Sequence, residues 1–425
     1  MSAPDPITFA SLGLSAPLLR TLAALGHAKP TPVQAAAIPA ILRRQDLLTR
    51  APTGSGKTAA FALPLLERFS QQQPQRPRPV RALVLVPTRE LAAQVAEAIA
   101  RYGAGLPARP VTCVCTGGVS INPQLLALRG GADLVVGTPG RLLELVEKNA
   151  LKPGAVEALV IDEADRLLSL GFADELERVL ALLPAQRQNL LFSATYSPAV
   201  RALCKSLLHA PARIELGGEE PAGPAAIVQR AIAVDTEHRT SLLRSLLKTE
   251  GWSQVLVFVA SQHGADHVAL KLNRSGVDAL PLHGDLSQGA RTQALAGFKA
   301  GRVRVLVATD VASRGLDIAL LPAVVNYDLP RSPADYLHRI GRTGRAGEAG
   351  VAVSFVTPET EQHFRLIERR HGLSLLREKV AGLEATAVVV PPRDPHGGIK
   401  GKRKSKKDKL REAAARVAEV ARDEE

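Results

Sequence analysis

The short apolar runs that recur along the chain constrain the fold more than any other feature. Runs such as Ala158–Ile161 and Val255–Val259 are apolar at every position rather than at alternate positions. Strands covered by helices on both faces have this pattern, which is typical of parallel sheets. We predict strands at Ala82–Val86, Val111–Cys115, Leu134–Val136, Ala158–Ile161, Asn189–Phe192, Val255–Val259, Ala279–Leu282, Val303–Ala308, Val324–Tyr327 and Val351–Val356, and helices at Glu90–Arg101, Arg141–Glu147, Phe172–Leu183, Gly264–Leu272 and Pro333–Arg339.

A stretch rich in glycine and proline, residues 217–224, divides this pattern into two halves. It has no apolar periodicity, which is typical of a linker. Since 46% of the 425 residues are hydrophobic, each half is large enough to bury a core. We therefore predict an α/β fold with two parallel-sheet domains in tandem, residues 1–216 and 227–378, joined by a linker at 217–226.

The chain carries an excess of positive charge. Its 54 Lys and Arg residues against 41 Asp and Glu residues give a net charge of +13. Residues 391–425 contribute 11 basic and 7 acidic residues, so a net +9 belongs to the rest of the chain. This distribution favours a polyanionic partner, although a basic surface without a partner stays open as the alternative.

The C-terminal residues 379–425 are predicted to form a basic and largely disordered tail. Within it, Lys400–Lys409 carries seven basic residues and one acidic residue, with no pattern that could form a core. We interpret this run as a sequence-independent tether for a polyanionic partner. A solubilising tail or a tail that binds another protein stays open as the alternative.

Several classes of protein are disfavoured by the sequence. The three cysteines, Cys113, Cys115 and Cys204, have neither the number for a disulfide framework nor the spacing of a zinc site. No apolar run approaches the roughly 18 residues of a membrane span. Residues 1–6 lack the basic and apolar regions of a secretory signal. We therefore expect a cytoplasmic protein that is not bound to a membrane.

A phosphate-binding loop is predicted at Ala51–Thr58, which reads APTGSGKT. Gly54 and Gly56 would let backbone N–H groups approach phosphate oxygens, and Lys57 would supply positive charge to the β and γ phosphates. The Thr58 hydroxyl is a candidate Mg²⁺ ligand. The general pattern has glycine where Ala51 stands, so a helix cap rich in glycine and threonine is the alternative for this loop taken alone.

An acidic segment, Asp162–Asp165, follows the predicted strand Ala158–Ile161. Asp162 is a second candidate ligand for Mg²⁺. Its neighbour Glu163 is a candidate to orient and deprotonate an attacking water molecule. Acidic residues also favour the first turn of a helix, which is the alternative for this segment alone. Together with a phosphate loop, the segment favours nucleotide hydrolysis.

The same four residues, Asp162-Glu163-Ala164-Asp165, spell the motif that names the DEAD-box RNA helicases. The chain resembles that family from about Phe9 to Phe355, with the family's motifs in the family's order. The resemblance implies two RecA-like domains that face a central cleft. It also implies that ATP and Mg²⁺ bind mainly to the first domain and that RNA spans both. Among subgroups, the chain is most similar to the bacterial RhlE-like helicases.

The resemblance also implies which residues bind the nucleotide. Pro30–Gln34 is similar to the family's adenine-reading segment, and the Gln34 amide has the donor and acceptor that an adenine edge needs. His27 is a departure, because the family usually has Phe or Tyr at this position. The implied nucleotide contacts are Phe9, Gln34, Ala51, Pro52, Thr53, Gly54, Ser55, Gly56, Lys57, Thr58, Gly315 and Asp317.

Another set of residues matches the family's RNA-contacting motifs. Hydroxyls, amides and cations of this kind contact phosphates and sugars rather than base edges. The chain has one Trp, four Tyr and nine Phe, too few for an extensive stacking platform. We therefore expect RNA to be bound mainly through its sugar-phosphate backbone. The implied contacts are Thr88, Arg89, Gly118, Thr138, Arg141 and Thr309.

The second half supplies two candidate arginine fingers. Arg342 and Arg345 are three residues apart and would share one face of a helical turn. They complete a predicted catalytic set with Lys57, Asp162 and Glu163. The resemblance further implies that ATP hydrolysis is coupled to unwinding through Asp165, Ser193, Thr195 and His338.

These observations predict an ATP-dependent RNA helicase that unwinds short duplexes and remodels RNA or RNA–protein complexes. The helicase core is expected to be monomeric, and both ribosomal and mRNA-turnover complexes fit as partners. Two alternatives stay open. One is a DNA-directed translocase on the same scaffold, and the other is an RNA chaperone whose catalysis is incidental.

Overall fold

The computed structural model describes residues 7–52, 54–72, 75–216, 227–313, 321–344 and 350–385. Several predictions lie outside these residues, so the structure does not bear on them. They concern Thr53, Gly315, Asp317, Arg345, the linker at 217–226 and the tail from residue 386 onward.

The first domain is built on a seven-stranded sheet whose strands are all parallel. The strand order is β3-β4-β2-β5-β6-β1-β7, so the chain crosses over the sheet repeatedly and helices fill the crossovers. The strands are β1 (Leu47–Arg50), β2 (Ala82–Leu85), β3 (Thr112–Cys115), β4 (Leu134–Gly137), β5 (Ala158–Ile161), β6 (Gln188–Ser193) and β7 (Ala212–Glu215).

Helices cover both faces of this sheet, which is why its strands are apolar at every position. In β2, Ala82 and Val84 belong to one core, whereas Leu83 and Leu85 belong to the other. The helices are α1 (Ala16–Ala24), α2 (Pro32–Leu42), α3 (Lys57–Ser70), α4 (Arg89–Tyr102), α5 (Asn122–Leu128), α6 (Pro139–Glu147), α7 (Ala164–Ser169), α8 (Ala173–Ala181) and α9 (Pro198–Leu207), with 3-10 turns η1 (Phe9–Leu12), η2 (Gly103–Gly105) and η3 (Pro153–Ala155).

The second domain repeats this architecture with a second parallel sheet, in the order β10-β11-β9-β12-β13-β8-β14. Its strands are β8 (Ile227–Ala233), β9 (Val255–Val259), β10 (Ala279–Leu282), β11 (Val305–Thr309), β12 (Ala323–Asn326), β13 (Gly350–Val356) and β14 (Arg377–Glu378). Its helices are α10 (Arg239–Thr249), α11 (Gln262–Asn273), α12 (Gln288–Lys299), α13 (Asp310–Ser313), α14 (Pro333–Ile340) and α15 (Glu361–His371), preceded by η4 (Thr236–His238).

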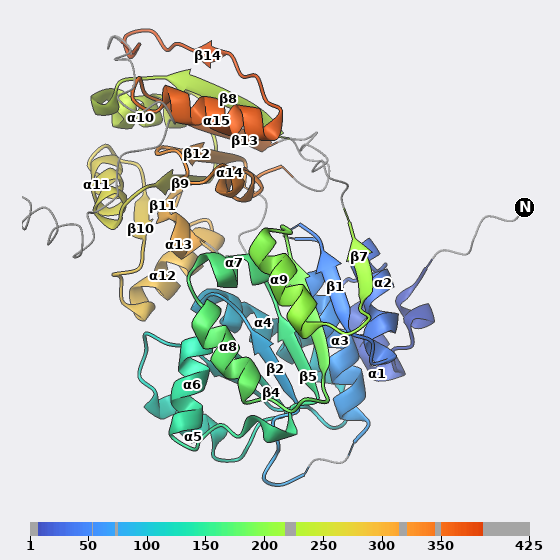
Figure 1. The fold of residues 1–425 in the computed structure, drawn as a ribbon. Coiled ribbons are helices and arrows are strands. Elements are labelled where there is room, and N and C mark those ends of the chain that lie inside the picture. Colours follow the sequence, from blue (N-terminus) through green and yellow to red (C-terminus); the bar gives the residue numbers. More distant parts are fainter. Residues whose placement is uncertain are drawn as a thin grey trace, which may run out of the picture.

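The predicted α/β class with two parallel sheets in tandem is confirmed. Figure 1 shows the second domain stacked on the first, with α12 on the side that faces it. The packed part of the second domain extends past residue 378, because Val380 and Leu383 lie against its core. In the part of the chain that the structure describes, no helix has the length and hydropathy needed to cross a membrane.

One buried arginine organises the polar interior of the second domain. Arg339, on α14, is 2% exposed and forms a two-pronged ion pair with Asp310, with Nε–Oδ1 at 2.6 Å and Nη2–Oδ2 at 2.8 Å. Its Nη1 also donates to Asn326 Oδ1 and Asp328 O. A guanidinium with this many acceptors fixes α14 against the ends of β11 and β12.

Replacing Arg339 with Met should therefore destabilise the second domain by about 3–5 kcal/mol, because the two-pronged ion pair with Asp310 and the hydrogen bonds to Asn326 and Asp328 would be lost. Denaturant unfolding of the full chain measures this loss. Arg178→Met is the matched control, because the Arg178–Glu147 pair is 61% and 65% exposed and is worth about 0–1 kcal/mol. Equal effects of the two substitutions would contradict the organising role of Arg339.

Candidate nucleotide and RNA site

The predicted phosphate loop lies at the carboxyl end of β1, between that strand and α3. Ala51 N donates to Ser193 O at 3.1 Å, which ties the loop to the end of β6. Gly54 and Gly56 have positive φ angles of 78° and 90°. A Cβ at Gly56 would lie 2.4 Å from Gln34 Nε2, so a glycine is required at that position.

Lys57 is the first residue of α3 and is only 7% exposed. Its Nζ donates to Ala51 O at 2.8 Å and to Pro52 O at 3.0 Å. Burial lowers the pKa of Lys57, and the charges on Asp162 and Glu163 oppose that shift. The loop therefore encloses a buried ammonium group at the point where the sequence predicts the β and γ phosphates.

Asp162 directly follows β5 and is 2% exposed. Burial raises the pKa of Asp162 to about 6, although the charge of Lys57 opposes this. Its Oδ1 accepts a hydrogen bond from Glu163 N at 2.9 Å. A buried carboxylate of this kind is stabilised in its ionised form by a nearby cation.

This environment fits a divalent cation. Within the described residues, no group of three or more His, Cys, Asp and Glu side chains could hold a metal ion by itself. However, Mg²⁺ in phosphoryl-transfer sites is usually held by one or two protein oxygens together with substrate phosphates. The carboxylate of Asp162 and the hydroxyl of Thr58, in the first turn of α3, are of the kind that Mg²⁺ prefers.

Glu163 occupies an unusual backbone conformation at the start of α7, with φ 52° and ψ 51°. Its carboxylate Oε2 lies 3.2 Å from Arg166 Nη1, and both side chains are nearly buried, at 11% and 6% exposed. This contact is an ion pair without a hydrogen bond, since neither atom has a hydrogen-bond partner among the described residues. Arg166 thus neutralises the Glu163 charge and confines the carboxylate without bonding it tightly.

The predicted coupling residues of the first domain lie together. Asp165 Oδ2 accepts hydrogen bonds from Thr195 N at 3.0 Å and from Thr195 Oγ1 at 2.7 Å. Ser193 Oγ donates to Thr195 O at 2.7 Å. Asp165 on α7 is therefore joined directly to the segment that follows β6. The fourth predicted coupling residue, His338 on α14, has Nδ1 3.9 Å from Asp335 Oδ1 on its own helix.

The predicted adenine-reading segment is fastened to the phosphate loop. Thr31 caps α2 by accepting from Gln34 N, and its Oγ1 donates to Ser55 O at 2.8 Å. The Gln34 amide accepts from Thr31 N at 3.0 Å and donates to Gly56 O at 3.2 Å. Phe9 is buried in the core at 5% exposed rather than placed in an open pocket. His27 contacts the Tyr102 ring, with ring centroids 5.9 Å apart.

The structure brings together the RNA-contacting residues predicted in the first domain. Arg89 Nη1 donates to Gly118 O at 3.0 Å, and Thr138 Oγ1 accepts from Gly117 N at 3.4 Å. Arg141 Nη2 donates to Val119 O at 2.8 Å. These contacts converge on the loop after β3.

Thr88 lies beside this group, since it caps α4 by accepting from Leu91 N at 3.2 Å. Helix starts and loops at the carboxyl edge of a parallel sheet are a common place for ligand binding.

The residues predicted in the second domain are only partly described. Thr309 ends β11 and is 8% exposed. Arg342 follows α14, and its carbonyl oxygen accepts from Leu321 N at 3.2 Å. Since Arg345, Gly315 and Asp317 lie outside the described residues, the catalytic set of this domain stays a prediction.

A buried ion pair joins the two domains. Arg291 Nη2 on α12 lies 2.6 Å from Glu90 Oε1 on α4, and the side chains are 5% and 7% exposed. Burial lowers the pKa of Arg291, and the charge of Glu90 opposes that shift. Glu90 follows the predicted RNA-contacting residue Arg89, so this domain contact adjoins the predicted RNA site.

Sequence reasoning missed the roles of Arg166 and Arg291. Arg166 immediately follows the acidic motif and stands three residues after Glu163, so helical spacing could have indicated the pairing. The pairing of Arg291 with Glu90 is different, because it joins residues of separate domains. A single sequence carries no signal for such a contact.

Family comparisons agree with this architecture. The DEAD/DEAH box helicase family matches residues 31–203, and the family described as helicase conserved C-terminal domain matches residues 238–347. These two ranges cover the phosphate loop, the acidic motif, strands β9 to β12 of the second sheet and Arg342.

Curated relatives are similar over most of the chain. It is 41% identical over 379 residues to the ATP-dependent RNA helicase DeaD of Mycobacterium tuberculosis, covering 89% of this chain and 66% of that protein. It is 42% identical over 369 residues to DeaD of Escherichia coli, covering 87% and 58%. It is 39% identical over 377 residues to the DEAD-box ATP-dependent RNA helicase CshA of Geobacillus kaustophilus, covering 89% and 79%. The chain thus spans between 58% and 79% of the length of these relatives.

Solved structures match as well. Dbp5 of Saccharomyces cerevisiae bound to RNA and ADP BeF3 is 32% identical, with a TM-score of 0.78 and coverage of 88% of this chain and 95% of that one. A DEAD box protein of Methanococcus jannaschii is 36% identical with a TM-score of 0.51, covering 88% and 99%. The better overlay is therefore with the RNA- and nucleotide-bound protein, although its sequence identity is lower.

The two sheets, the phosphate loop and the acidic motif together define a tandem RecA-like nucleotide-binding protein. Within that class, the chain belongs to the DEAD-box family of ATP-dependent RNA helicases. The more detailed prediction of an RhlE-like subgroup stays a prediction.

We expect Arg291→Met to weaken the contact between the domains by about 3 kcal/mol, because the buried Glu90 carboxylate would lose its partner. The RNA concentration that gives half-maximal stimulation of ATP hydrolysis should then rise. The affinity for ATP in the absence of RNA should stay within about twofold of the wild-type value. The double variant Glu90→Gln with Arg291→Met removes both charges and should recover part of the loss. An unchanged RNA requirement in Arg291→Met would contradict the role of this pair.

Proposed function

We propose that the protein hydrolyses ATP in an RNA-stimulated reaction and uses the cycle to separate short RNA duplexes and to remodel RNA–protein complexes. The observation that carries this proposal is the buried cluster of Lys57, Asp162 and Glu163 at the carboxyl edge of the first sheet. Family membership supports the same activity, although the chain spans only part of several relatives.

ATP binds with its β and γ phosphates in the loop Ala51–Thr58. Lys57 then exchanges the Ala51 and Pro52 carbonyls for phosphate oxygens, which satisfy the buried ammonium group better because they are charged. Thr58 and Asp162 would hold Mg²⁺, which would supply positive charge to neutralise the phosphates. The Thr31 and Gln34 segment is hydrogen-bonded to the same loop, so a base bound by this segment stabilises the loop as well.

Glu163 acts as the general base for the attacking water. Its Oε2 is confined by Arg166, which leaves the other carboxylate oxygen to accept a proton from water. Arg342 and Arg345, from the second domain, stabilise the charge that develops on the γ phosphate. Hydrolysis therefore requires both domains.

RNA binds through its backbone to the group around Arg89, Gly118, Thr138 and Arg141, and to Thr309 of the second domain. The Glu90–Arg291 pair holds the domains together beside that site. Since ATP and RNA both favour the closed arrangement, each raises the affinity for the other. The Asp165–Thr195 contact links the acidic motif to the segment after β6, which couples hydrolysis to reopening.

Two further functions have less support. A DNA-directed translocase would be stimulated by DNA as strongly as by RNA. An RNA chaperone would keep annealing RNA when ATP turnover is abolished. The burial of Lys57 and Asp162 is energetically unfavourable and perturbs the pKa of both groups, which is typical of catalytic sites. A passive RNA-binding surface does not require such a cluster, so this observation favours an enzyme.

We further propose a cytoplasmic location and a monomeric core that acts in ribosomal or mRNA-turnover complexes. The net charge of +13 supports a polyanionic partner.

Measuring phosphate release with and without single-stranded RNA tests the proposed activity. We expect Mg²⁺-dependent ATP hydrolysis that RNA stimulates at least tenfold more than DNA of the same sequence. Equal stimulation by DNA would favour the translocase, and no hydrolysis under any condition would contradict the proposal.

Glu163→Gln should keep ATP and RNA binding but lower kcat by about 10²–10⁴-fold, because the amide keeps the shape and loses the base. Single-turnover hydrolysis and equilibrium binding of ATP and RNA measure the two effects. Near wild-type turnover would show that Glu163 is not the base.

Arg166→Met should lower kcat by about tenfold while the KM for ATP changes less than threefold, because it frees the Glu163 carboxylate without touching the phosphate loop. Arg166→Lys keeps the charge and should recover part of the rate. In a Glu163→Gln background, Arg166→Met should cause little further loss. An equal additional loss in that background would mean that Arg166 acts independently of Glu163.

A further inference from the structure

The first domain has a pocket on the edge opposite the nucleotide site. Its volume is about 250 Å³, and its charged lining residues are Arg78, Arg81, Asp133 and Glu157. These residues precede strands β2, β4 and β5, whereas the phosphate loop and acidic motif follow strands of the same sheet. At about 3.3 Å per residue, four-residue strands separate the two edges by roughly 13 Å. The pocket is therefore distinct from the site described above.

Positive charge exceeds negative charge around this pocket. Three guanidinium groups converge on the single carboxylate of Glu157, at 3.0 Å from Arg81, 3.2 Å from Arg68 and 3.7 Å from Arg44. Burial would raise the pKa of Glu157, but hydrogen bonds and charge from Arg81 and Arg68 lower it. Burial lowers the pKa of Arg68, and the charges of Arg44 and Arg81 add to that effect. The charge of Glu157 and its hydrogen bond oppose the shift, so three guanidinium groups share one carboxylate.

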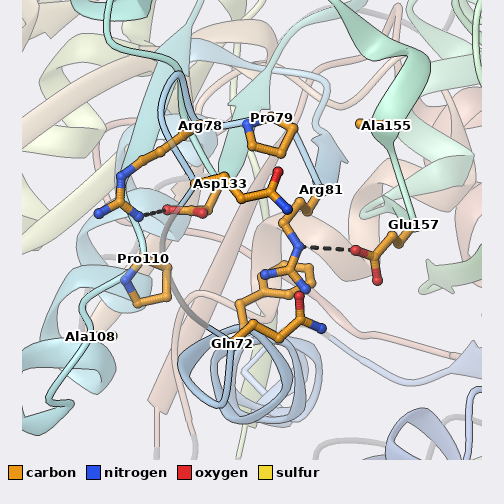
Figure 2. A pocket seen from close by; sticks show the side chains of 11 residues that line it. Gln72, Arg78, Pro79, Arg81, Ala108, Pro110, Asp133, Ala155 and Glu157 are labelled. Carbon is orange, nitrogen blue, oxygen red and sulfur yellow. Dashed lines mark hydrogen bonds and ion pairs between the residues drawn. The ribbon is translucent and has the colours of Figure 1, made fainter.

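The arginines are held in place before any ligand binds. Figure 2 shows Arg78 paired with Asp133 and Arg81 paired with Glu157 on the two sides of the pocket. Arg81 is 8% exposed, and its guanidinium lies 4.0 Å from the centroid of the Phe69 ring. A further observation is that Arg81 Nη2 is buried and has no hydrogen-bond partner among the described residues. Preorganised guanidinium groups with spare donors suit oxyanions.

The rim of the pocket is also basic. The segments that carry the lining residues, 69–72, 75–81, 106–111, 129–133 and 152–157, contain six basic residues and two acidic ones. Four of these basic residues are not part of the ion pairs described above, and all four are exposed: Arg76, Arg109, Arg129 and Lys152. An anion that extends beyond the pocket would meet further cations on the surface.

We propose that this pocket binds a phosphate group. Proline and aromatic side chains in the lining, Pro79, Pro110 and Phe69, make the remaining walls apolar and leave the guanidinium groups to recognise the oxyanion. The exposed basic rim favours a backbone phosphate of an RNA strand that extends from the opposite edge of the domain. A free phosphorylated molecule has the same chemistry and is the second source to be tested.

Ala108 lines the pocket and is half-buried, so it offers a matched pair of variants. Ala108→Glu places a carboxylate where the phosphate would bind, whereas Ala108→Gln adds a side chain of nearly the same size without charge. Ala155, which lines the pocket and is exposed, gives a second pair, Ala155→Glu and Ala155→Gln, in case the first pair does not fold.

Two binding measurements on the full chain distinguish the sources. The first compares an RNA long enough only for the central site with the same RNA carrying a single-stranded extension of about 12 nucleotides on either end. At roughly 3.4 Å per nucleotide, this extension exceeds the span between the two edges of the domain. The second titrates inorganic pyrophosphate. Pyrophosphate also binds to the phosphate loop, but both variants of a pair share that loop. A difference in pyrophosphate binding between the two variants therefore reports on the pocket alone.

If RNA is the source, the extension should raise RNA affinity about tenfold in wild type and Ala108→Gln but less than threefold in Ala108→Glu. In Ala108→Glu, the slope of log RNA affinity against log salt concentration should fall in magnitude by about 0.7 for each RNA phosphate that the protein no longer neutralises. If a free phosphorylated molecule is the source, only pyrophosphate binding should differ between the two variants. ATP hydrolysis stimulated by the short RNA should be equal in the wild type and in all the variants. Failure of this proposal is thereby distinguished from failure of the proposed function.

Equal binding of both the extended RNA and pyrophosphate by Ala108→Glu and Ala108→Gln would overturn the proposal. A second result would also overturn the proposal: a polyglutamate peptide binds the two variants with different affinities, whereas neither the extended RNA nor pyrophosphate does. The pocket would then be a site for acidic protein segments.

Discussion

The buried ammonium group of Lys57 is the interaction on which the rest of the structure depends. It lies under the phosphate loop, held by two backbone carbonyls and close to the carboxylates of Asp162 and Glu163. Burial opposes the charge on both Lys57 and Asp162, and each charge opposes the shift of the other. The parallel sheet brings them together, because β1 and β5 both end at the same edge. Such a cluster is costly to bury and is explained by a charged ligand.

The same edge carries the contacts that transmit the state of the nucleotide. Asp165 is bonded to Thr195, and Gln34 is bonded to the phosphate loop at Gly56. The ion pair between Glu90 and Arg291, which joins the domains, adjoins the predicted RNA site. A ligand that moves the loop or the acidic motif therefore acts on residues that already touch the predicted RNA-binding or coupling segments. These short chains of contacts give the two ligands a physical route to affect one another.

The sequence predicts much of this arrangement because its strongest signals are local. The strands Ala158–Ile161, Val255–Val259 and Ala279–Leu282 have the predicted bounds, since apolar residues at nearly every position leave little choice. Strands β1 and β8 are not among the predicted strands, because Thr49, Gln229 and Arg230 interrupt their apolar runs and only pairing with neighbours makes them strands. In the site, Lys57 and Asp162 follow from motifs. The buried position of Phe9 and the pairing of Arg291 depend on packing between distant segments, which spacing along the chain does not encode.

The central claim is that ATP and RNA bind one closed arrangement of the two domains. The most direct test measures RNA affinity with and without a saturating non-hydrolysable ATP analogue, and the affinity for that analogue with and without saturating RNA. The account predicts that each ligand strengthens binding of the other by the same factor, about tenfold or more, as reciprocal coupling requires. Affinities that do not depend on the other ligand would contradict it.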